Sequence, residues 1–260
     1  MNKKEILAEI KKIKVWHHCI NLSEEITTPG LQDTQALLSQ ISLPKSLKDL
    51  RVLDLGARDG FFSFECEKRG AKEVIAIDYV DQKDTGFSLC KKILKSKVKF
   101  INANIYTINP KFLGKFDVVL FLGLIYHLRH PALAIDRIYD VLNSNGLLIL
   151  ESHTIDHGLV DSSGNWTSLI DDYKNIQIAQ FYSNGSLGGD VTNFWAPNQK
   201  CLEMLLSNSG FEITDSWTVA FRGGVSGRKI DIPNNHPRWV DTAMTLDMYN
   251  NLAVKKHGDL

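Results

Sequence analysis

The chain has 260 residues, of which 43% are hydrophobic and 23% charged, with 18 glycines and 7 prolines. This composition is typical of a globular protein with one main core, and it excludes a collagenous, low-complexity or mostly disordered chain. Thirty basic residues balance thirty acidic ones. The charge therefore does not favour nucleic acid as a partner, although a local basic patch keeps that alternative open.

The N-terminal sequence MNKKEILAEIKKIK places Ile6, Ile10 and Ile13 at helical spacing among lysines. We expect an amphipathic helix here rather than a secretory leader, because no apolar core follows the lysines. No apolar run is long enough to span a membrane, so we expect a cytoplasmic protein without a membrane partner. The cysteines form no CxxC pair and are expected to be reduced structural thiols: Cys19, Cys66, Cys90 and Cys201.

Between residues 51 and 151, short apolar runs alternate with longer amphipathic ones, which predicts an α/β fold with a doubly wound, mostly parallel sheet. The expected strands are Arg51–Leu55, Glu73–Ile77, Lys97–Ile101, Phe116–Leu122 and Leu147–Glu151. The expected helices are Phe61–Arg69, Asp84–Leu94 and Pro131–Leu142.

The chain beyond Glu151 is polar and rich in glycine and serine, so we expect a substrate cap inserted at about residues 152–192. A helix at about Pro197–Ser209, ended by Gly210, and a sixth strand at Phe211–Ala220 should follow. The stretch Phe221–Pro237 is predicted to be irregular. In this scheme residues 1–48 form an N-terminal helical lid segment, and residues 49–260 form the main domain with its cap.

The sequence VLDLGARDGFFSFE begins at Val52 and places Asp54 at a strand end, followed by Gly56 and Gly60. Glycine lets the backbone approach a ligand, and the helix that follows offers unpaired N–H groups, so a nucleotide-like ligand is expected. The third glycine of a dinucleotide fingerprint is missing, which disfavours NAD. A simple tight turn is the alternative.

Asp78 ends the second expected strand, where such folds place a carboxylate against ribose hydroxyls. The alternative is a solvated acid that begins a turn.

Four motifs, in order, are DLGARDGFFSFECEKRGA, VIAIDY, FDVVLFLGLIYHLRHPALAIDRI and LLILESHTID. Together they resemble class I S-adenosylmethionine-dependent methyltransferases, and more narrowly the tRNA wobble-uridine (5-oxyacetic acid) methyltransferase-like family. WHHCINLSEEITTPG upstream and NFWAPNQKCLEMLLSNSGFE downstream extend the resemblance to about residues 15–220. It implies a Rossmann-like fold and S-adenosylmethionine as cofactor. Because the family includes both a tRNA enzyme and relatives assigned to small molecules, the acceptor must be argued from the site.

The resemblance also implies a set of cofactor contacts, to which the glycine loop adds Asp54 and Gly60. The implied contacts are Gly56, Ala57, Arg58, Asp78, Tyr79, Ile105, Tyr106, Leu122 and Tyr126.

The family's tRNA enzyme uses a carboxylated donor, and the resemblance implies that an upstream lysine, Tyr126 and a C-terminal arginine hold the extra carboxylate. The upstream stretch HHCINLSEEITTPGLQDTQ contains neither Lys nor Arg, and Gln35 stands where a second lysine is expected. An unpaired buried carboxylate is costly. We therefore expect ordinary S-adenosylmethionine as the donor.

Methyl transfer to a hydroxyl requires an aligned acceptor and a proton acceptor. His127 follows the fourth expected strand, where ligands bind in such folds, and is the candidate base, with Tyr126 packing beside the donor. His153 is the competing base, and Glu151 could orient a histidine or grip a substrate hydroxyl. Structural roles for these residues stay open. No metal is expected, because the combination of Glu151, His153, Asp156 and His157 fits no ligand motif.

Several further residues are candidates for acceptor binding. Trp16 and His18 could belong to a lid, and Asn193 with Trp195 offers an amide and a stacking surface for a sugar or a base. Arg222 and Arg228 lie among glycines in FRGGVSGRK, which could hold a diphosphate. Core packing and a solvated hairpin tip are the alternatives.

These features predict an O-methyltransferase that acts on a hydroxyl of a small polar acceptor, a nucleotide-linked or cell-surface (capsular) sugar. The alternative is methyl or carboxymethyl transfer to a tRNA wobble uridine, for which the N-terminal lysines and Lys91–Lys99 offer a limited basic surface. A methyltransferase-like binding protein without activity is disfavoured by the Gly56, Gly60 and Asp78 set. The sequence assigns no oligomeric state.

Overall fold

A computed structural model describes residues 1–161, 165–168, 173, 175–233 and 236. The chain divides into two compact units, and each is described by itself below. The first unit comprises Met1–Ile105 and Phe116–Leu120, and the second comprises Tyr106–Lys115 and Phe121–Leu260. The predicted lid segment 1–48, main domain 49–260 and cap at about 152–192 follow different boundaries and stay a prediction.

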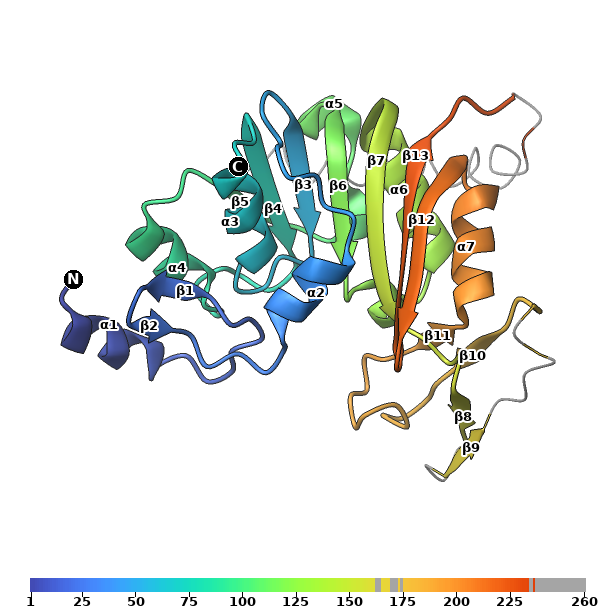
Figure 1. Cartoon of the computed structure of the whole chain (residues 1–260), viewed down its shortest axis with the longest axis horizontal. Helices are drawn as coiled ribbons and strands as arrows, with labels where there is room; N and C mark the ends of the chain where they lie inside the picture. Colours follow the sequence, from blue (N-terminus) through green and yellow to red (C-terminus); the bar gives the residue numbers. More distant parts are fainter. Residues whose placement is uncertain (162–164, 169–172, 174, 234–235, 237–260) are drawn as a thin grey trace. The chain divides into compact units, whose positions relative to one another are not determined.

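A seven-stranded sheet has the order β12-β13-β7-β6-β3-β4-β5 (Figure 1). Strands β3, β4 and β5 pair in parallel, whereas β7, β13 and β12 pair antiparallel. The strands are β3 (Arg51–Leu55), β4 (Glu73–Asp78), β5 (Lys99–Asn102), β6 (Phe116–Leu122), β7 (Leu142–His153), β12 (Phe211–Val219) and β13 (Arg222–Lys229). The predicted α/β class with a doubly wound sheet is confirmed.

The predicted N-terminal helix is present as α1 (Lys3–Ile10) in the first unit. Asn2 and Glu5 form a capping box at its start, which satisfies N–H groups that the first helical turn leaves unpaired. Its residues Ile6 and Ile10 are buried. The other elements are β1 (Asn21–Ser23), β2 (Ile26–Thr27), α2 (Thr34–Gln40), α3 (Phe61–Lys68), α4 (Phe87–Leu94) and the 3-10 turn η1 (Ile105–Thr107).

The second unit contains two longer helices, which agree with the predictions apart from small shifts of their ends. Gly210 follows α7 with a left-handed φ of 89°, as expected for a residue that ends a helix. The elements are α5 (Pro110–Leu113), the 3-10 turn η2 (Ile125–His127), α6 (Pro131–Val141), β8 (Gly158–Val160), β9 (Trp166–Ser168), β10 (Ala179–Phe181), β11 (Trp195–Pro197) and α7 (Gln199–Asn208).

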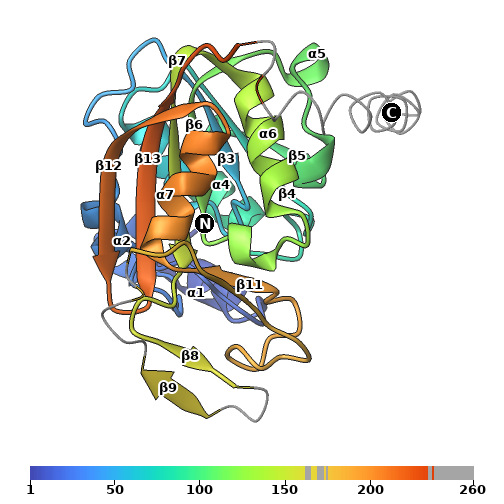
Figure 2. The same ribbon diagram turned by 90° about the vertical axis from the view of Figure 1, so that its right-hand side faces the viewer.

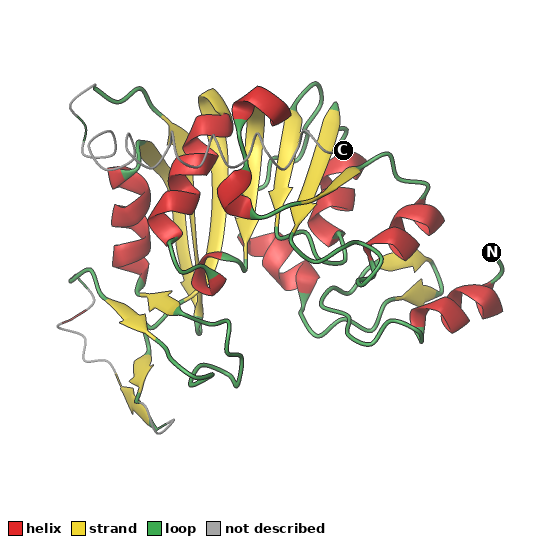
Figure 3. Ribbon diagram, turned by 180° about the vertical axis from the view of Figure 1, so that it is seen from behind, coloured by secondary structure: helices red, strands yellow, loops and turns green. Residues whose placement is uncertain are grey.

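The prediction that the stretch from Phe221 is irregular is wrong, because Arg222–Lys229 forms a strand between β12 and β7. Glycine is a poor strand former. At two glycines of this strand, however, side chains of other residues occupy the space where a Cβ would lie. A Cβ on Gly224 would lie 2.4 Å from the indole of Trp217, and one on Gly223 would lie 2.2 Å from Gln199 Oε1. Helix α7 lies beside this hairpin (Figures 2 and 3).

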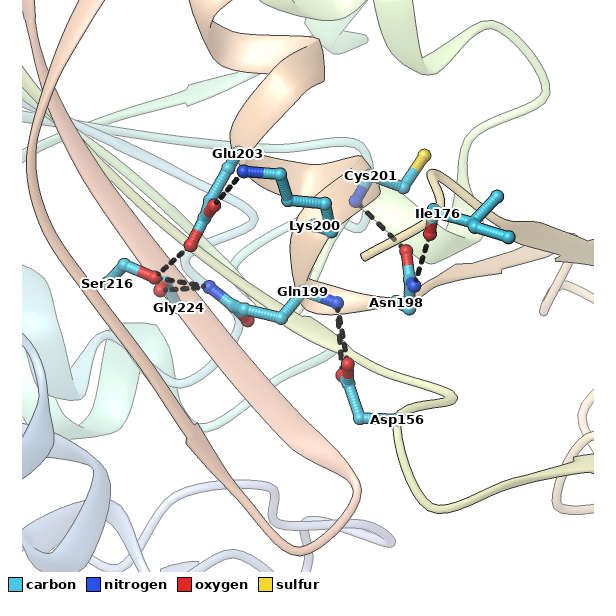
Figure 4. A network of polar contacts seen from close by, with 9 residues as sticks. All are labelled: Asp156, Ile176, Asn198, Gln199, Lys200, Cys201, Glu203, Ser216 and Gly224. Carbon is cyan, nitrogen blue, oxygen red and sulfur yellow. Dashed lines mark hydrogen bonds and ion pairs between the residues drawn. The ribbon is translucent and has the colours of Figure 1, made fainter. Parts of the chain in front are cut away.

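The segment after β7 carries a small core of its own, in which Ile155, Tyr182 and Ala196 are buried. A polar network joins this segment to α7 and to the β12–β13 hairpin (Figure 4). Asp156 accepts the backbone N–H of Gln199 with both carboxylate oxygens, each at 3.0 Å. The Gln199 amide then donates to the carbonyl of Gly224 at 2.9 Å. The predicted cap segment is thus anchored to the strand that carries Arg222.

Among the residues that the structure describes, no helix combines the length and the apolar character needed to cross a membrane.

Candidate active site

The loop between β3 and α3 turns sharply and contains three residues with positive φ. Gly56 has φ 78°, Arg58 has φ 46° and Gly60 has φ 92°. Glycine is required at position 60 for a second reason, since a Cβ there would lie 2.7 Å from the rings of Phe64 and Phe87. The loop is thus held in one conformation at the end of a parallel strand, where such folds bind nucleotides.

Asp78, at the end of β4, holds this loop from the neighbouring strand. Its Oδ2 accepts the backbone N–H of Arg58 at 2.9 Å, and its Oδ1 accepts that of Val80 at 2.8 Å. Each carboxylate oxygen can accept further hydrogen bonds, so the fixed carboxylate suits a ribose diol. Tyr79 beside it is 69% exposed. The residues present therefore fit the nucleoside of S-adenosylmethionine.

Asp54 is buried in β3, two residues before Gly56. Burial raises its pKa to about 6, and the hydroxyl of Ser63 donates to its Oδ2 at 2.5 Å. Ala57 and Ile105 are also buried. The predicted cofactor contacts of Asp54, Ala57 and Ile105 stay predictions.

Asp59 joins three separate segments of the first unit, a role that the sequence analysis missed. This fully buried carboxylate accepts the backbone N–H groups of His17 at 2.7 Å, His18 at 3.0 Å and Gly86 at 2.8 Å. The available signal was an acidic residue in a tight loop just before Gly60, where backbone N–H groups need acceptors. The segment around His17 is thereby fixed to the glycine loop.

Trp16 and His18, predicted as acceptor-binding lid residues, are both buried. The Trp16 indole N–H donates to the carbonyl of Ile10 at 3.2 Å, and its ring fills the space beside Gly86. The His18 ring contacts Phe61 and Phe62, and burial lowers the pKa of His18 to about 4. Packing explains both side chains, and their role toward an acceptor stays a prediction.

In the second unit, the polar ends of the Tyr126, Glu151 and Arg222 side chains lie together beside Gly123. The Arg222 guanidinium binds the Glu151 carboxylate at two points, Nε to Oε1 and Nη2 to Oε2, the latter at 2.6 Å. Its Nη1 donates to the Tyr126 hydroxyl at 3.4 Å, and the guanidinium lies 5.3 Å from the centre of that ring. Burial lowers the pKa of Arg222, but the Glu151 carboxylate outweighs this effect and raises it.

His153 and His127, the two candidate bases, have different surroundings. His153 is stacked on Phe221, with ring centres 6.1 Å apart, and burial followed by the charge of Arg222 lowers its pKa to about 4. His127 is half-buried in η2, and its Nδ1 lies 3.0 Å from the hydroxyl oxygen of Thr192. A histidine whose conjugate acid has a pKa of about 4 is a weak base, which disfavours His153, and His127 as the base stays a prediction.

Two further predicted cofactor contacts lie in the second unit. The Tyr106 hydroxyl accepts the backbone N–H of His130 at 3.0 Å, and Leu122 is half-buried at the end of β6. Contact of the cofactor with Tyr106, Leu122 or Tyr126 stays a prediction.

Asn193 and Trp195 each carry a buried polar atom that has no hydrogen-bond partner among the described residues, namely Oδ1 of Asn193 and the indole nitrogen of Trp195. Trp195 packs edge to face with Phe181, at 4.9 Å between ring centres. These atoms lie in the segment predicted to bind the acceptor.

Arg222 and Arg228 lie on a strand and not in the irregular loop from which a diphosphate site was predicted. They lie at opposite parts of β13, roughly 20 Å apart along an extended strand, and Arg228 donates to the carbonyl of Asn145 at 2.9 Å. Binding of a diphosphate by either arginine stays a prediction.

No group of three or more His, Cys, Asp or Glu residues within the described part of the chain is arranged to hold a metal ion. Glu151 is paired with Arg222, and Asp156 accepts the backbone N–H of Gln199. The alternative metal ligand set of Glu151, His153, Asp156 and His157 therefore lacks support.

A family model described as a methyltransferase domain matches residues 30–215. The chain belongs to this methyltransferase family. A curated relative, the tRNA U34 carboxymethyltransferase of Helicobacter acinonychis (strain Sheeba), is 26% identical over 161 residues. That match covers 61% of this chain and 62% of the relative. The enzyme of the same name from Campylobacter hominis is 30% identical over 120 residues, 45% of this chain and 42% of the relative.

Solved structures support the fold of the methyltransferase. An S-adenosylmethionine-dependent methyltransferase from Mesorhizobium loti has a TM-score of 0.55 at 16% identity, covering 75% of this chain and 96% of that one. The N-terminal domain of EvdMO1, solved with S-adenosylhomocysteine bound, has a TM-score of 0.60 at 19% identity, covering 88% and 98%. The predicted Rossmann-like class I fold and membership of the methyltransferases are confirmed, and S-adenosylmethionine as the cofactor is taken up in the proposal below.

Proposed function

We propose that the protein transfers a methyl group from S-adenosylmethionine to a hydroxyl of a small polar acceptor, a nucleotide-linked or cell-surface sugar. The observation that carries this proposal is the Glu151–Arg222 pair beside Tyr126 and His153. The carboxylate compensates the guanidinium charge, which leaves hydrogen-bonding groups with little net charge. Such a cluster suits hydroxyl groups better than a row of phosphates.

The bound cofactor supplies an electrophilic methyl group on a sulfonium. Asp78 and the loop from Gly56 to Gly60 hold the nucleoside end, and His127 accepts the proton of the acceptor hydroxyl. Tyr126 and Arg222 offer donors to oxygen atoms of the acceptor, with Arg222 held in place by Glu151. The protein's contribution is alignment together with removal of one proton.

A sugar acceptor gains further support from a neighbour of the fold. The N-terminal domain of EvdMO1 has also been solved in the presence of S-adenosylhomocysteine and D-fucose, and its structure has a TM-score of 0.59 to this chain at 19% identity. We propose that this protein also acts on a sugar. A cytoplasmic location is part of the same proposal.

The second candidate function is modification of a tRNA wobble uridine, which the names of the curated relatives favour. The lysines at α1 also favour it, because Lys3, Lys4 and Lys11 lie close together on the surface beside Leu7 and Ala8. Three lysines would neutralise only a few phosphates. This candidate therefore ranks below the sugar.

Incubation with methyl-labelled S-adenosylmethionine and two acceptor pools, nucleotide sugars and undermodified tRNA, tests the proposal. We expect label in the sugar pool, and less of it with the Asp78→Ala variant when the cofactor is not saturating. Label confined to the tRNA pool would replace the proposal with the second candidate. Label in neither pool would contradict both acceptor assignments.

The donor is tested by competition between S-adenosylmethionine and its carboxylated form. Arg222 is already paired with Glu151, and no upstream Lys or Arg accompanies Tyr126 in the stretch from His17 to Gln35. We therefore expect tighter binding of S-adenosylmethionine. A clear preference for the carboxylated donor would support carboxymethyl transfer instead.

A further inference from the structure

Arg58 is held at three points within the first unit. Its backbone N–H donates to Asp78 at 2.9 Å, and its carbonyl accepts the hydroxyl of Thr85 at 3.1 Å. Its side-chain Nη2 lies 2.6 Å from Nε2 of His17. Arg58 also has a left-handed φ of 46°, a conformation that costs energy for a residue other than glycine. These contacts fix both the backbone and the direction of the guanidinium.

The Arg58–His17 contact defines the protonation of the histidine. Arginine has N–H donors and no acceptor, so Nε2 of His17 must be the acceptor and the ring must be neutral. Burial and the charge of Arg58 lower the pKa of His17, which agrees with this assignment. His17 in turn is fixed by Asp59, which accepts its backbone N–H at 2.7 Å.

The guanidinium charge of Arg58 is not neutralised by an ion pair. Across the described ranges of the chain, no carboxylate forms an ion pair with Arg58. The two nearby acids, Asp59 and Asp78, have their oxygens engaged by backbone N–H groups. One N–H of Arg58 reaches His17, and its side chain is only partly buried. The remaining N–H donors can bind an anion.

We propose that Arg58 binds the α-carboxylate of the methionine part of the cofactor and that His17 is a positioning residue that aims the guanidinium at it. The α-carboxylate is the only anionic group of S-adenosylmethionine. The backbone N–H of Arg58 donates to Asp78, the residue that fits the ribose, so two hydrogen-bonded residues from the β3–α3 loop and the end of β4 would recognise the ribose and the α-carboxylate. A planar guanidinium suits a carboxylate because it can donate two parallel hydrogen bonds.

Calorimetric binding of two ligands to the full chain tests the Arg58 assignment. The ligands are S-adenosylmethionine and decarboxylated S-adenosylmethionine, which keeps the sulfonium and the amine. The wild-type protein should bind S-adenosylmethionine more tightly than the decarboxylated ligand. Arg58→Met should weaken the binding of S-adenosylmethionine roughly 10- to 100-fold. Binding of the decarboxylated ligand should change by less than about threefold. Equal weakening of both ligands would overturn the proposal, because it would show that Arg58 only shapes the loop.

His17 variants test the positioning role by the ratio of the two affinities. His17→Gln keeps a side-chain acceptor and should retain most of the preference for S-adenosylmethionine, whereas His17→Leu should lose much of it. A purely structural role would change both affinities together. An unchanged ratio in His17→Leu would remove His17 from the proposal. If Arg58→Met does not fold, Arg58→Lys replaces it, because lysine keeps the charge but cannot donate two parallel hydrogen bonds. This variant should lose part of the preference for S-adenosylmethionine over the decarboxylated ligand. An unchanged ratio of the two affinities would overturn the assignment.

Discussion

Glu151 on β7 and Arg222 on β13 form a two-point ion pair between residues 71 positions apart in the sequence. The strand register explains the contact, because Glu151 lies opposite Gly224 and Arg222 lies opposite His153. The two side chains are therefore diagonal neighbours on one face of the sheet. Glu151 is completely buried, whereas the side chain of Arg222 is 36% exposed.

Replacing one partner of this pair should destabilise the protein. Glu151→Gln would leave the Arg222 charge without its partner, and we expect a loss of about 2 kcal/mol in the free energy of unfolding. This is less than the roughly 3–5 kcal/mol of a fully buried pair, because solvent screens the exposed part of Arg222. Urea denaturation measures the change.

Arg228→Gln is a matched control for this prediction, because Arg228 is an exposed arginine on the same strand with a single hydrogen bond to Asn145. It should change the stability by no more than about 0.5 kcal/mol. If Glu151→Gln behaved like this control, the ion pair would contribute little to the folded state.

The lowered pKa of His153 predicts a pH dependence of stability. Its pKa is about 4 in the folded protein and near 6.5 when exposed, so below pH 6.5 the unfolded chain binds the proton first. The stability is then fully present above about pH 6.5 and is lost as the pH falls toward 4. We expect His153→Asn to lose less stability than the wild type over this range, by about 1–3 kcal/mol.

Unfolding free energies of both proteins at pH 7, 6, 5 and 4.5 test this dependence. The quantity to compare is the difference in unfolding free energy between His153→Asn and the wild type at each pH. Asp54, whose pKa is raised to about 6, makes the folded state more stable as the pH falls, and it does so equally in both proteins. Parallel curves for the two proteins would contradict the assignment to His153.

The proton acceptor is tested by two histidine variants. His127→Ala should lower turnover by about 10²–10⁴, the usual contribution of a positioned base, with little change in cofactor affinity. His153→Ala should have a milder effect. Single-turnover rates with saturating cofactor measure both. A large loss of turnover in His153→Ala with nearly normal turnover in His127→Ala would assign the base to His153, at the end of β7. No loss in either variant would favour alignment of the acceptor without a base.

Cofactor affinity should depend on Asp78. Asp78→Ala removes the carboxylate that is fixed by Arg58 and Val80, and we expect weaker binding of S-adenosylhomocysteine by about 1–3 kcal/mol. Calorimetry measures this loss, and far-ultraviolet circular dichroism checks that the fold is retained. An unchanged affinity would remove Asp78 from the site.

The parallel half of the fold and its glycine loop could be predicted from the sequence because their signals are local. Apolar runs define β3, β4 and β6, and Gly60 marks the start of α3. The strand β13 could not be predicted in this way. Its glycines are explained only by Trp217 and Gln199, which are brought next to it by the fold.

The site shows the same division between local and long-range signals. The carboxylate of Asp78 at a strand end is a local pattern, whereas the contacts of Asp59 with His17, His18 and Gly86 join distant segments. The pairing of Arg222 with Glu151 depends on strand register, which the sequence alone does not reveal. The diphosphate site expected at Arg222 and Arg228 was predicted from an irregular loop, whereas this segment forms β13.

Product analysis with a carbon-13-labelled methyl donor distinguishes methyl transfer to a sugar hydroxyl from modification of tRNA. Mass spectrometry and nuclear magnetic resonance should show one labelled methyl group per acceptor, bound to a sugar oxygen as a methyl ether. At a cofactor concentration near the dissociation constant of the wild type, the Asp78→Ala variant should form much less product. Label on a base of tRNA, or a carboxymethyl group there when the carboxylated donor is supplied, would contradict the account.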